Sequence, residues 1–295
     1  MRSTSPQRHG VWPTLALVGP PLLLYLLFAV VPIGVAAWFS LTDWDGIRRD
    51  IGFVGLDNYE RMAGDPEVHR AFLVTAVLAV VATLAVNAIA IPVAVLLSHN
   101  GVITRVYRSA IFFPLVLSPI VVGFLWQSVL STTGLLNGLL RSLDMQPVIF
   151  LGQPTLAVAS IAFVTIWQSL GFTTILYLAA LRTIPDDLYE AARIDGAGSF
   201  AQFRHVTFPL LAPALTVNVV LLMIFFMRLY EYVLVMTQGG PVGSTQTVAY
   251  LLVLQAFERA KYGYGSAIAI VMLLVVGVVA ALLIAGMRRR ERAAG

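Results

Sequence analysis

The sequence lacks cysteine altogether and contains little charge. Without cysteine in 295 residues, disulfides, iron–sulfur clusters and thiol catalysis are excluded. Charged residues make up 12% of the chain, whereas soluble domains typically contain about 25%. Hydrophobic residues make up 59%. This composition indicates a protein that lies in a membrane.

The chain also lacks the residues of the common catalytic and nucleotide-binding motifs. Lys261 is the only lysine, and it follows Ala260, whereas a GxxxxGKS or GxxxxGKT phosphate loop needs a lysine after a glycine. Such an ATPase site is therefore excluded, so energy from ATP would have to come from another subunit. The four histidines lie in separate segments without metal-ligand spacing, and no GxSxG or HExxH motif occurs. No catalytic residue, metal site or cofactor is predicted within this chain.

Long uncharged runs predict an all-α integral membrane protein with a single domain over residues 1–295. Six runs exceed the roughly 20 residues that a helix needs to span a bilayer. The fifth run contains Arg228, and we expect its helix to continue past this residue. The predicted helices lie near residues 12–39, 71–98, 107–130, 155–181, 207–236 and 263–287.

The distribution of basic residues predicts the orientation. With the N-terminus inside the cell, cytoplasmic segments hold 11 of the 19 basic residues, outside loops hold 7, and Arg228 lies in the membrane. The positive-inside rule therefore places both termini in the cytoplasm of a multi-pass protein of the bacterial cytoplasmic membrane. The net charge of +4 reflects this topology and does not indicate nucleic-acid binding.

The longest polar interruption in the second half of the chain spans residues 185–209, on the predicted cytoplasmic side. Asp187 and Glu190 stand three apart and predict a capping box at the start of a short helix over residues 188–195. Gly196 suits the left-handed conformation that ends helices. A helix of about two turns cannot cross a bilayer.

A second short helix is predicted to follow in the same loop. Ser199 and Gln202 repeat the capping pattern, and the helix should run towards Pro209. Between the two helices, residues 196–198 read Gly-Ala-Gly and leave room for another backbone to approach. Physical arguments alone leave an ordinary solvated hairpin open, because capping boxes are common in loops.

The order of residues in this loop resembles the EAA loop of ABC importer permeases. EAA at residues 190–192 is followed by DGA at residues 195–197 and by VTFP at residues 206–209. Val206 and Phe208 replace the usual Ile and Leu, and both stay apolar. The resemblance implies that this loop docks on a partner ATPase, through Glu190, Ala191, Ala192, Asp195, Gly196 and Ala197.

Four further segments resemble the carbohydrate-uptake branch of these permeases, which includes maltose and glycerol-phosphate importers. They are FVGLDNY at residues 53–59, GLLNGLL at 134–140, TQGGP at 237–241 and GYGSA at 263–267. The resemblance implies the type I importer fold and a sugar or oligosaccharide substrate. It also implies three partners besides membrane lipid, namely a second permease, an ATPase dimer that binds ATP and Mg²⁺, and an extracytoplasmic solute-binding protein.

Polar and aromatic side chains inside the predicted helices are candidates for the substrate path, since a sugar needs hydrogen bonds along its ring edge and an apolar face. Packing between helices is the competing role for such residues. Arg228 and Glu231 stand three apart, which predicts one helical face and permits an internal ion pair. The candidates are Trp126, Gln127, Trp167, Gln168, Arg228, Tyr230 and Glu231.

Two other classes of protein stay open. An ion-coupled secondary transporter could use Arg228 and Glu231, although inverted repeats and paired broken helices are not evident. An intramembrane enzyme would need a reactive pair within the helices, and none is found. Transport without ATP would favour the first class, and turnover by the isolated chain would favour the second.

Overall fold

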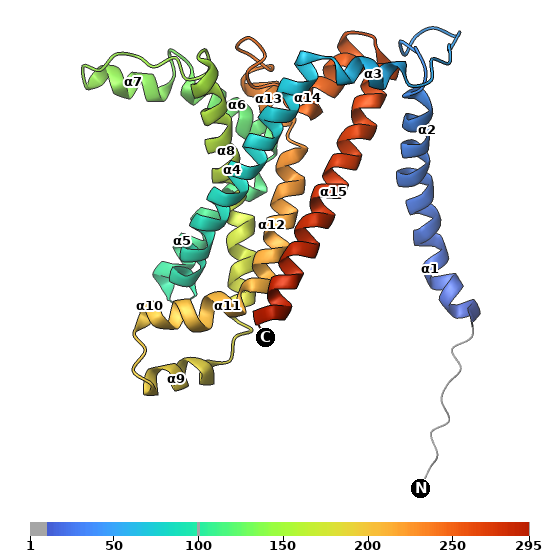
Figure 1. Ribbon diagram of the computed structural model, residues 1–295. Helices are drawn as coiled ribbons and strands as arrows, with labels where there is room; N and C mark the ends of the chain where they lie inside the picture. The colour runs from blue at the N-terminus through green and yellow to red at the C-terminus, as the bar shows by residue number, and fades with distance from the viewer. Residues whose placement is uncertain (1–10, 99–100, 295) are drawn as a thin grey trace. The chain divides into compact units, whose positions relative to one another are not determined.

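The computed structural model describes residues 11–98 and 101–294, and this part of the chain is helical. An antiparallel bridge joins Thr42 to Phe53. The chain divides into two compact units (Figure 1). The first unit extends to Gly64 and includes Leu252–Val271, and the second comprises Asp65–Leu251 and the segment from Met272 onward.

The first unit begins with a continuous helical stretch. It consists of α1 (Val11–Tyr25), the π-helical turn η1 (Leu26–Val30) and α2 (Val31–Phe39). The π turn ends two residues before Pro32, whose backbone nitrogen carries no hydrogen to donate. Further elements of this unit are α3 (Asp57–Ala63), η3 (Leu254–Glu258), the end of α14 (Val248–Val253) and the start of α15 (Tyr262–Ala294).

The FVGLDNY segment holds the end of α2 in place. The Asn58 side chain donates to the carbonyl oxygens of Ser40 and Thr42 at 2.9 and 2.8 Å. The Tyr59 hydroxyl lies 2.6 Å from Ser40 Oγ. Gly55 has φ +60°, a conformation that favours glycine. The residues of this segment therefore have a local structural role.

A close backbone contact forms where α15 begins. The Gly263 amide donates to the Trp44 carbonyl at 2.8 Å. A Cβ atom on Gly263 would lie 2.1 Å from the Thr42 carbonyl oxygen, so only glycine fits. The Tyr262 ring packs edge-on against Trp44 and Phe39, at 5.0 and 5.6 Å between ring centroids.

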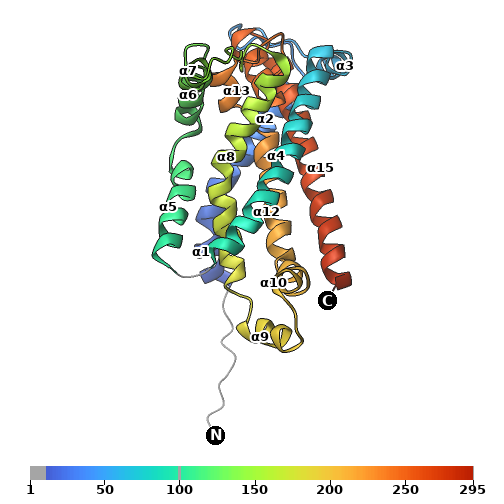
Figure 2. The same ribbon diagram turned by 90° about the vertical axis from the view of Figure 1, so that its left-hand side faces the viewer.

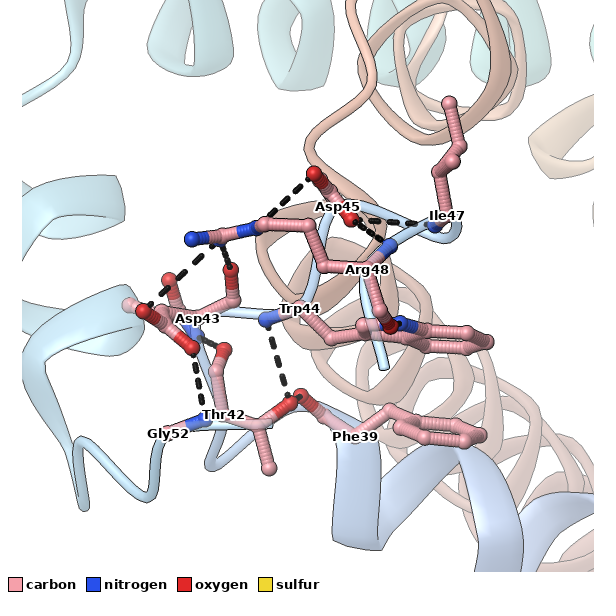
Figure 3. A network of polar contacts seen from close by, with 9 residues as sticks. Phe39, Thr42, Asp43, Trp44, Asp45, Ile47, Arg48 and Gly52 are labelled. Atoms are coloured by element: carbon pink, nitrogen blue, oxygen red, sulfur yellow. Dashed lines mark hydrogen bonds and ion pairs between the residues drawn. The ribbon is translucent and has the colours of Figure 1, made fainter. Parts of the chain in front are cut away.

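A polar network orders the loop after α2 (Figure 3). Arg48 Nε donates to Asp45 Oδ2 at 2.9 Å, and Arg48 also donates to the Asp43 carbonyl at 3.1 Å. Asp43 Oδ1 accepts from the Gly52 amide, and the Trp44 indole donates to the Arg48 carbonyl. Hydrogen bonds from the backbone amides of Arg48 and then Ile47 hold the pKa of Asp45 below its ordinary value.

The second unit is built around α4 (Pro66–Leu97), α8 (Pro154–Leu181) and α12 (Ala212–Met227), which pack against one another (Figure 2). The Tyr177 hydroxyl of α8 donates to Asn87 Oδ1 of α4. Asn87 therefore has a packing role, because its side chain joins α4 to α8. Small side chains let the helices approach closely, and those that α4 buries completely are Ala71, Ala79, Ala82, Ala90 and Ala94.

The prediction of one helix over residues 107–130 is wrong. The run forms α5 (Val102–Val116) and α6 (Pro119–Leu130), separated by Leu117 and Ser118 with ψ near +140°. Pro119 explains the break, because the residue before a proline is pushed out of the helical conformation. Beyond α6, the short helix α7 (Leu135–Ser142) lies in the connection to α8.

The prediction of one helix over residues 207–236 is also wrong. The segment Ser199–Leu210 meets α12 at an angle of 64°. At its other end α12 stops at Met227, and a separate α13 (Glu231–Met236) follows. The Thr247 hydroxyl donates to the Leu229 carbonyl at 2.6 Å and so satisfies a backbone group freed by this second break.

Five helical segments of the described residues are long and apolar enough to cross a membrane, and the bent pair at Leu211 would be a sixth. The five are Leu17–Phe39, Pro66–Leu97, Pro119–Ser142, Pro154–Leu181 and Tyr262–Arg289. Their number and composition confirm an all-α, multi-pass membrane protein.

Candidate functional site

The polar loop forms α9 (Asp186–Ile194), at the end of the second unit opposite to α7 and α13 (Figures 1 and 2). The predicted capping box is wrong, because Pro185 is the N-cap and no side chain caps the helix. Asp187 instead lies in the first turn with Asp186. Both carboxylates there interact favourably with the helix dipole.

The C-terminal end of α9 is a Schellman motif. The Gly196 amide donates to the Arg193 carbonyl at 3.0 Å, and the Ala197 amide donates to the Ala192 carbonyl at 2.9 Å. Gly196 has φ +80°, which confirms the predicted left-handed conformation. A Cβ atom on Gly196 would have nothing within 4 Å, so backbone conformation rather than space within this chain requires glycine.

The chain then returns towards the membrane helices along a continuous helical arm, Ser199–Leu210. It consists of α10 (Ser199–Gln202), the π turn η2 (Phe203–Thr207) and α11 (Phe208–Leu210). The second predicted capping box is wrong as well, since Gly198 is the N-cap. Gln202 instead donates to the Ala197 carbonyl at 2.8 Å.

One side-chain contact links α9 to this arm. The Tyr189 hydroxyl lies 3.0 Å from the Thr207 hydroxyl. No residue of α9 is buried within the chain. Among the predicted contact residues, Ala192 and Ala197 are half-buried, and Glu190, Ala191, Asp195 and Gly196 are exposed.

The two most exposed apolar side chains of this loop were not predicted as contacts. Ile194 is 87% exposed and Phe200 is 75% exposed. Exposed apolar groups of this size mark interaction surfaces when they gather at one place. The sequence held a signal for both, because they are isolated apolar residues in a polar segment.

A polar cleft of about 880 Å³ lies between α9 and the ends of the membrane helices. Its walls come from the ends of α4 and α8, from α9 and from the Ser199–Leu210 arm. The charged and polar lining includes Arg182, Asp186, Tyr189, Arg193, Ser199 and Gln202.

A second cavity, of about 340 Å³, lies among the membrane helices where α5 and α6 separate. Its walls are mainly apolar, and its polar groups are Gln168, Ser169 and Tyr232. Such a lining, apolar with a few polar groups, is typical of small-molecule sites. The apolar walls are Leu115, Leu117, Pro119, Phe172, Leu221, Leu222 and Phe225.

The Gln168 carboxamide is fully engaged at the edge of this cavity. Its Nε2 donates to the carbonyl oxygens of Pro114 and Leu117 at 3.2 and 2.8 Å. Its Oε1 accepts a hydrogen bond from the Tyr232 hydroxyl. Gln168 therefore provides a partner for the Leu117 carbonyl at the α5–α6 break, adds a second donor to the Pro114 carbonyl, and ties α8 to α13.

The other predicted path residues on α6 and α8 do not line the cavity. Trp126 packs edge-on against Trp167 and Phe163, at 5.6 and 5.2 Å between ring centroids. Gln127 is half-buried on α6. These aromatic rings join the two helices, which is the packing role left open above.

Arg228 and Glu231 do not share a helical face, because the chain leaves the helix between them. Arg228 is the exposed C-cap of α12, and Glu231 is the first residue of α13. The prediction that both residues lie on one helical face, where they could form an ion pair, is therefore wrong. Tyr230 stacks on Tyr250 at 6.3 Å between ring centroids. None of the three lines the cavity.

The comparisons with known proteins decide the family. A family model described as the binding-protein-dependent transport system inner membrane component matches residues 86–293. The chain belongs to this family. The permease is 34% identical over 282 residues to the diacetylchitobiose uptake system permease protein NgcF of Streptomyces coelicolor, covering 91% of this chain and 80% of that protein.

A second relative is the trehalose/maltose transport system permease protein MalF of Thermococcus litoralis. It is 33% identical over 258 residues, with 87% of each chain covered. A chain in the crystal structure of a bacterial alginate ABC transporter, in complex with alginate pentasaccharide-bound periplasmic protein, matches with a TM-score of 0.83. It is 23% identical and covers 95% of both chains, so it shows that the permease has the same fold.

The predicted resemblance to ABC importer permeases is confirmed by this membership. The alternative of an ion-coupled secondary transporter finds no support, because the family model and the relatives belong to binding-protein-dependent uptake systems.

Proposed function

We propose that this permease moves a sugar or oligosaccharide across the bacterial cytoplasmic membrane, driven by ATP hydrolysis in a partner subunit. The observation that carries the proposal is the identity with permeases named for diacetylchitobiose and for trehalose and maltose, over 91% and 87% of this chain. The small apolar cavity with three polar groups supports it.

The proposed assembly contains a second homologous permease, an ATPase dimer that holds ATP and Mg²⁺, and an extracytoplasmic solute-binding protein. The chain lacks an ATP phosphate loop, which supports a separate ATPase. Both termini and α9 lie on the cytoplasmic side in this proposal, in accord with the distribution of arginine.

In the proposed coupling step, α9 docks in a groove of the ATPase. Ile194 and Phe200 supply apolar contact area, and Glu190 and Asp195 supply polar contacts at the rim. The Schellman turn at Gly196 and Ala197 and the small side chains of Ala191 and Ala192 let the partner backbone approach. Closure of the ATPase dimer then moves α9 and, through the Ser199–Leu210 arm, α12.

In the proposed path, the sugar enters the cavity between α8, α12 and the α5–α6 break. Phe172 and Phe225 present apolar surface to the sugar ring, and Ser169 offers a hydroxyl for its edge. Gln168 has a positioning role, because its carboxamide already bonds to protein groups. Its volume of about 340 Å³ lies within the range of small-molecule sites.

Affinity purification of the chain from native membrane, with mass spectrometry of the proteins that accompany it, tests the assembly. We expect an ATPase, a second permease and a binding protein, and the binding protein can then be screened for its sugar. A chain that arrives alone, or without an ATPase, would contradict the proposal.

Filling the cavity tests the path. Ser169→Trp should abolish uptake of that sugar in proteoliposomes that contain the full assembly. Ile175→Trp is the matched control, because Ile175 lies on the same helix, is 37% exposed and does not line the cavity. Normal uptake by Ser169→Trp would place the path elsewhere.

A further inference from the structure

The polar cleft behind α9 has no part in the proposed docking or in the proposed path. The end of α4 and three consecutive segments from the end of α8 to the arm form it, and each supplies a polar or charged group. Ser98 lies at the end of α4, Arg182 follows the last residue of α8, Arg193 lies on α9, and Ser199 begins the arm. A ligand held here would contact α9 and the membrane helices at once.

The charges that line the cleft are two guanidinium groups and one carboxylate. Asp186 is the only acidic residue among the lining residues. Neither Arg182 nor Arg193 has an ion-pair partner in the part of the chain that the structure describes. Arg193 Nε donates to the Tyr189 carbonyl at 3.3 Å, which leaves its terminal nitrogens available. The cleft therefore carries a net positive charge.

This chemistry suits an anion with several oxygen atoms. Arginine binds phosphate through two parallel N–H···O bonds, and hydroxyl groups such as that of Ser199 add further donors. The terminal segments of the chain are poor occupants because they are themselves basic, with Arg2 and Arg8 at one end and Arg288–Arg290 at the other.

We propose that the cleft behind α9 binds a phosphate group through Arg182 and Arg193. The phosphate belongs either to the head group of an anionic lipid or to a soluble phosphorylated compound, since both present the same oxygen atoms. In either case the bound phosphate links α9 to the end of α8. The backbone of α9 should then open less often, and the amide hydrogens of Asp186–Ile194 should exchange more slowly.

Hydrogen–deuterium exchange on the full-length chain in phosphatidylcholine nanodiscs tests this site. One arm adds phosphatidylglycerol to the nanodiscs, and another adds inorganic phosphate. At about ten times the Kd, exchange in α9 should slow about tenfold. Slowing by phosphatidylglycerol alone identifies a lipid site, and slowing by inorganic phosphate identifies a soluble ligand.

Two double variants decide whether the cleft is responsible. Arg182→Gln with Arg193→Gln should abolish the slowing. Arg105→Gln with Arg204→Gln is the matched control, because it removes two exposed positive charges that do not line the cleft. The control should retain the full effect. Equal slowing in both variants, or no slowing of the unmodified chain by either source of phosphate, would overturn the proposal.

Discussion

The Tyr232 hydroxyl of α13 donates a hydrogen bond to the Gln168 carboxamide of α8, 64 residues away in the sequence. Both side chains are buried. Because the same carboxamide donates to two carbonyls at the α5–α6 break, one side chain connects three segments of the second unit. A buried polar group with all its partners present holds these segments in a defined arrangement.

Gln168→Leu should therefore destabilise the chain although leucine has a similar volume. The substitution leaves the Pro114 and Leu117 carbonyls and the Tyr232 hydroxyl without this partner, at a cost of about 2–4 kcal/mol. Tyr232→Phe removes one hydrogen bond and should cost about 1 kcal/mol. The measurement is the thermal unfolding midpoint in detergent.

The double variant is the control for this interpretation. Once Gln168 is gone, Tyr232→Phe should cost less than it does in the unmodified chain, because the acceptor is already absent. Strictly additive effects would mean that the two side chains are not coupled.

Ile194→Asp and Phe200→Asp should weaken association with the proposed partner ATPase by at least about tenfold, since each places a carboxylate in the proposed apolar contact. Binding of detergent-solubilised permease to immobilised ATPase measures this.

Val242→Asp is the matched control, because Val242 is 86% exposed but belongs to the loop after α13, at the other end of the second unit. All three variants should unfold within about 0.5 kcal/mol of the unmodified chain. A Val242→Asp effect as large as that of Ile194→Asp would argue against docking through α9.

Two glycines on α15 should respond in opposite ways to alanine. Gly263→Ala places a methyl group against the Thr42 carbonyl and should destabilise the chain by about 1–3 kcal/mol. Gly277 has open space around its Cα, so Gly277→Ala should stabilise α15 by about 0.5–1 kcal/mol. Thermal unfolding of both variants gives the comparison, and a destabilised Gly277→Ala would show that this face of α15 is covered.

The loop after α2 should lose its order in acid. The pKa of Asp45 is lowered in the folded chain. Ionised Asp45 therefore stabilises the folded loop fully above the ordinary aspartate pKa of about 3.9, and this stabilisation is lost as the pH falls through the lowered pKa. Trp44 reports on this, because its indole donates to the Arg48 carbonyl of the same loop. The fluorescence difference between the unmodified chain and Trp44→Phe should change below about pH 3.9. In Asp45→Asn, this fluorescence difference should depend less on pH.

The helices were predictable from sequence where a single property decides them. The length of an uncharged run depends only on the side chains within it, and the runs that became α4, α8 and α15 give long helices close to their predicted bounds. The breaks were not predicted, although Pro119 is a local signal for the first of them. They are stabilised by distant partners, Gln168 for the Leu117 carbonyl across 51 residues and Thr247 for the Leu229 carbonyl across 18.

The two candidate sites differ in the same respect. The α9 loop is local, so the order of its residues indicated both the helix and the turn at Gly196. The cavity is assembled from α5, α6, α8, α12 and α13, and only Gln168 among the seven predicted path residues lines it. The breaks separate the helices locally and so allow Phe172, Phe225 and Tyr232 to line the same cavity.

The 64° bend at Leu211 has a mechanical consequence. Leu211 is 1% exposed and packs in a cluster with Leu97, Tyr177 and Leu178, so the corner is held against the ends of α4 and α8. The arm from Ser199 is 12 residues long, about 18 Å, and α12 is 16 residues long, about 24 Å. The helix axis changes direction at Leu211, so a force along the arm acts across the axis of α12 and, through the packing of α12, on α4 and α8.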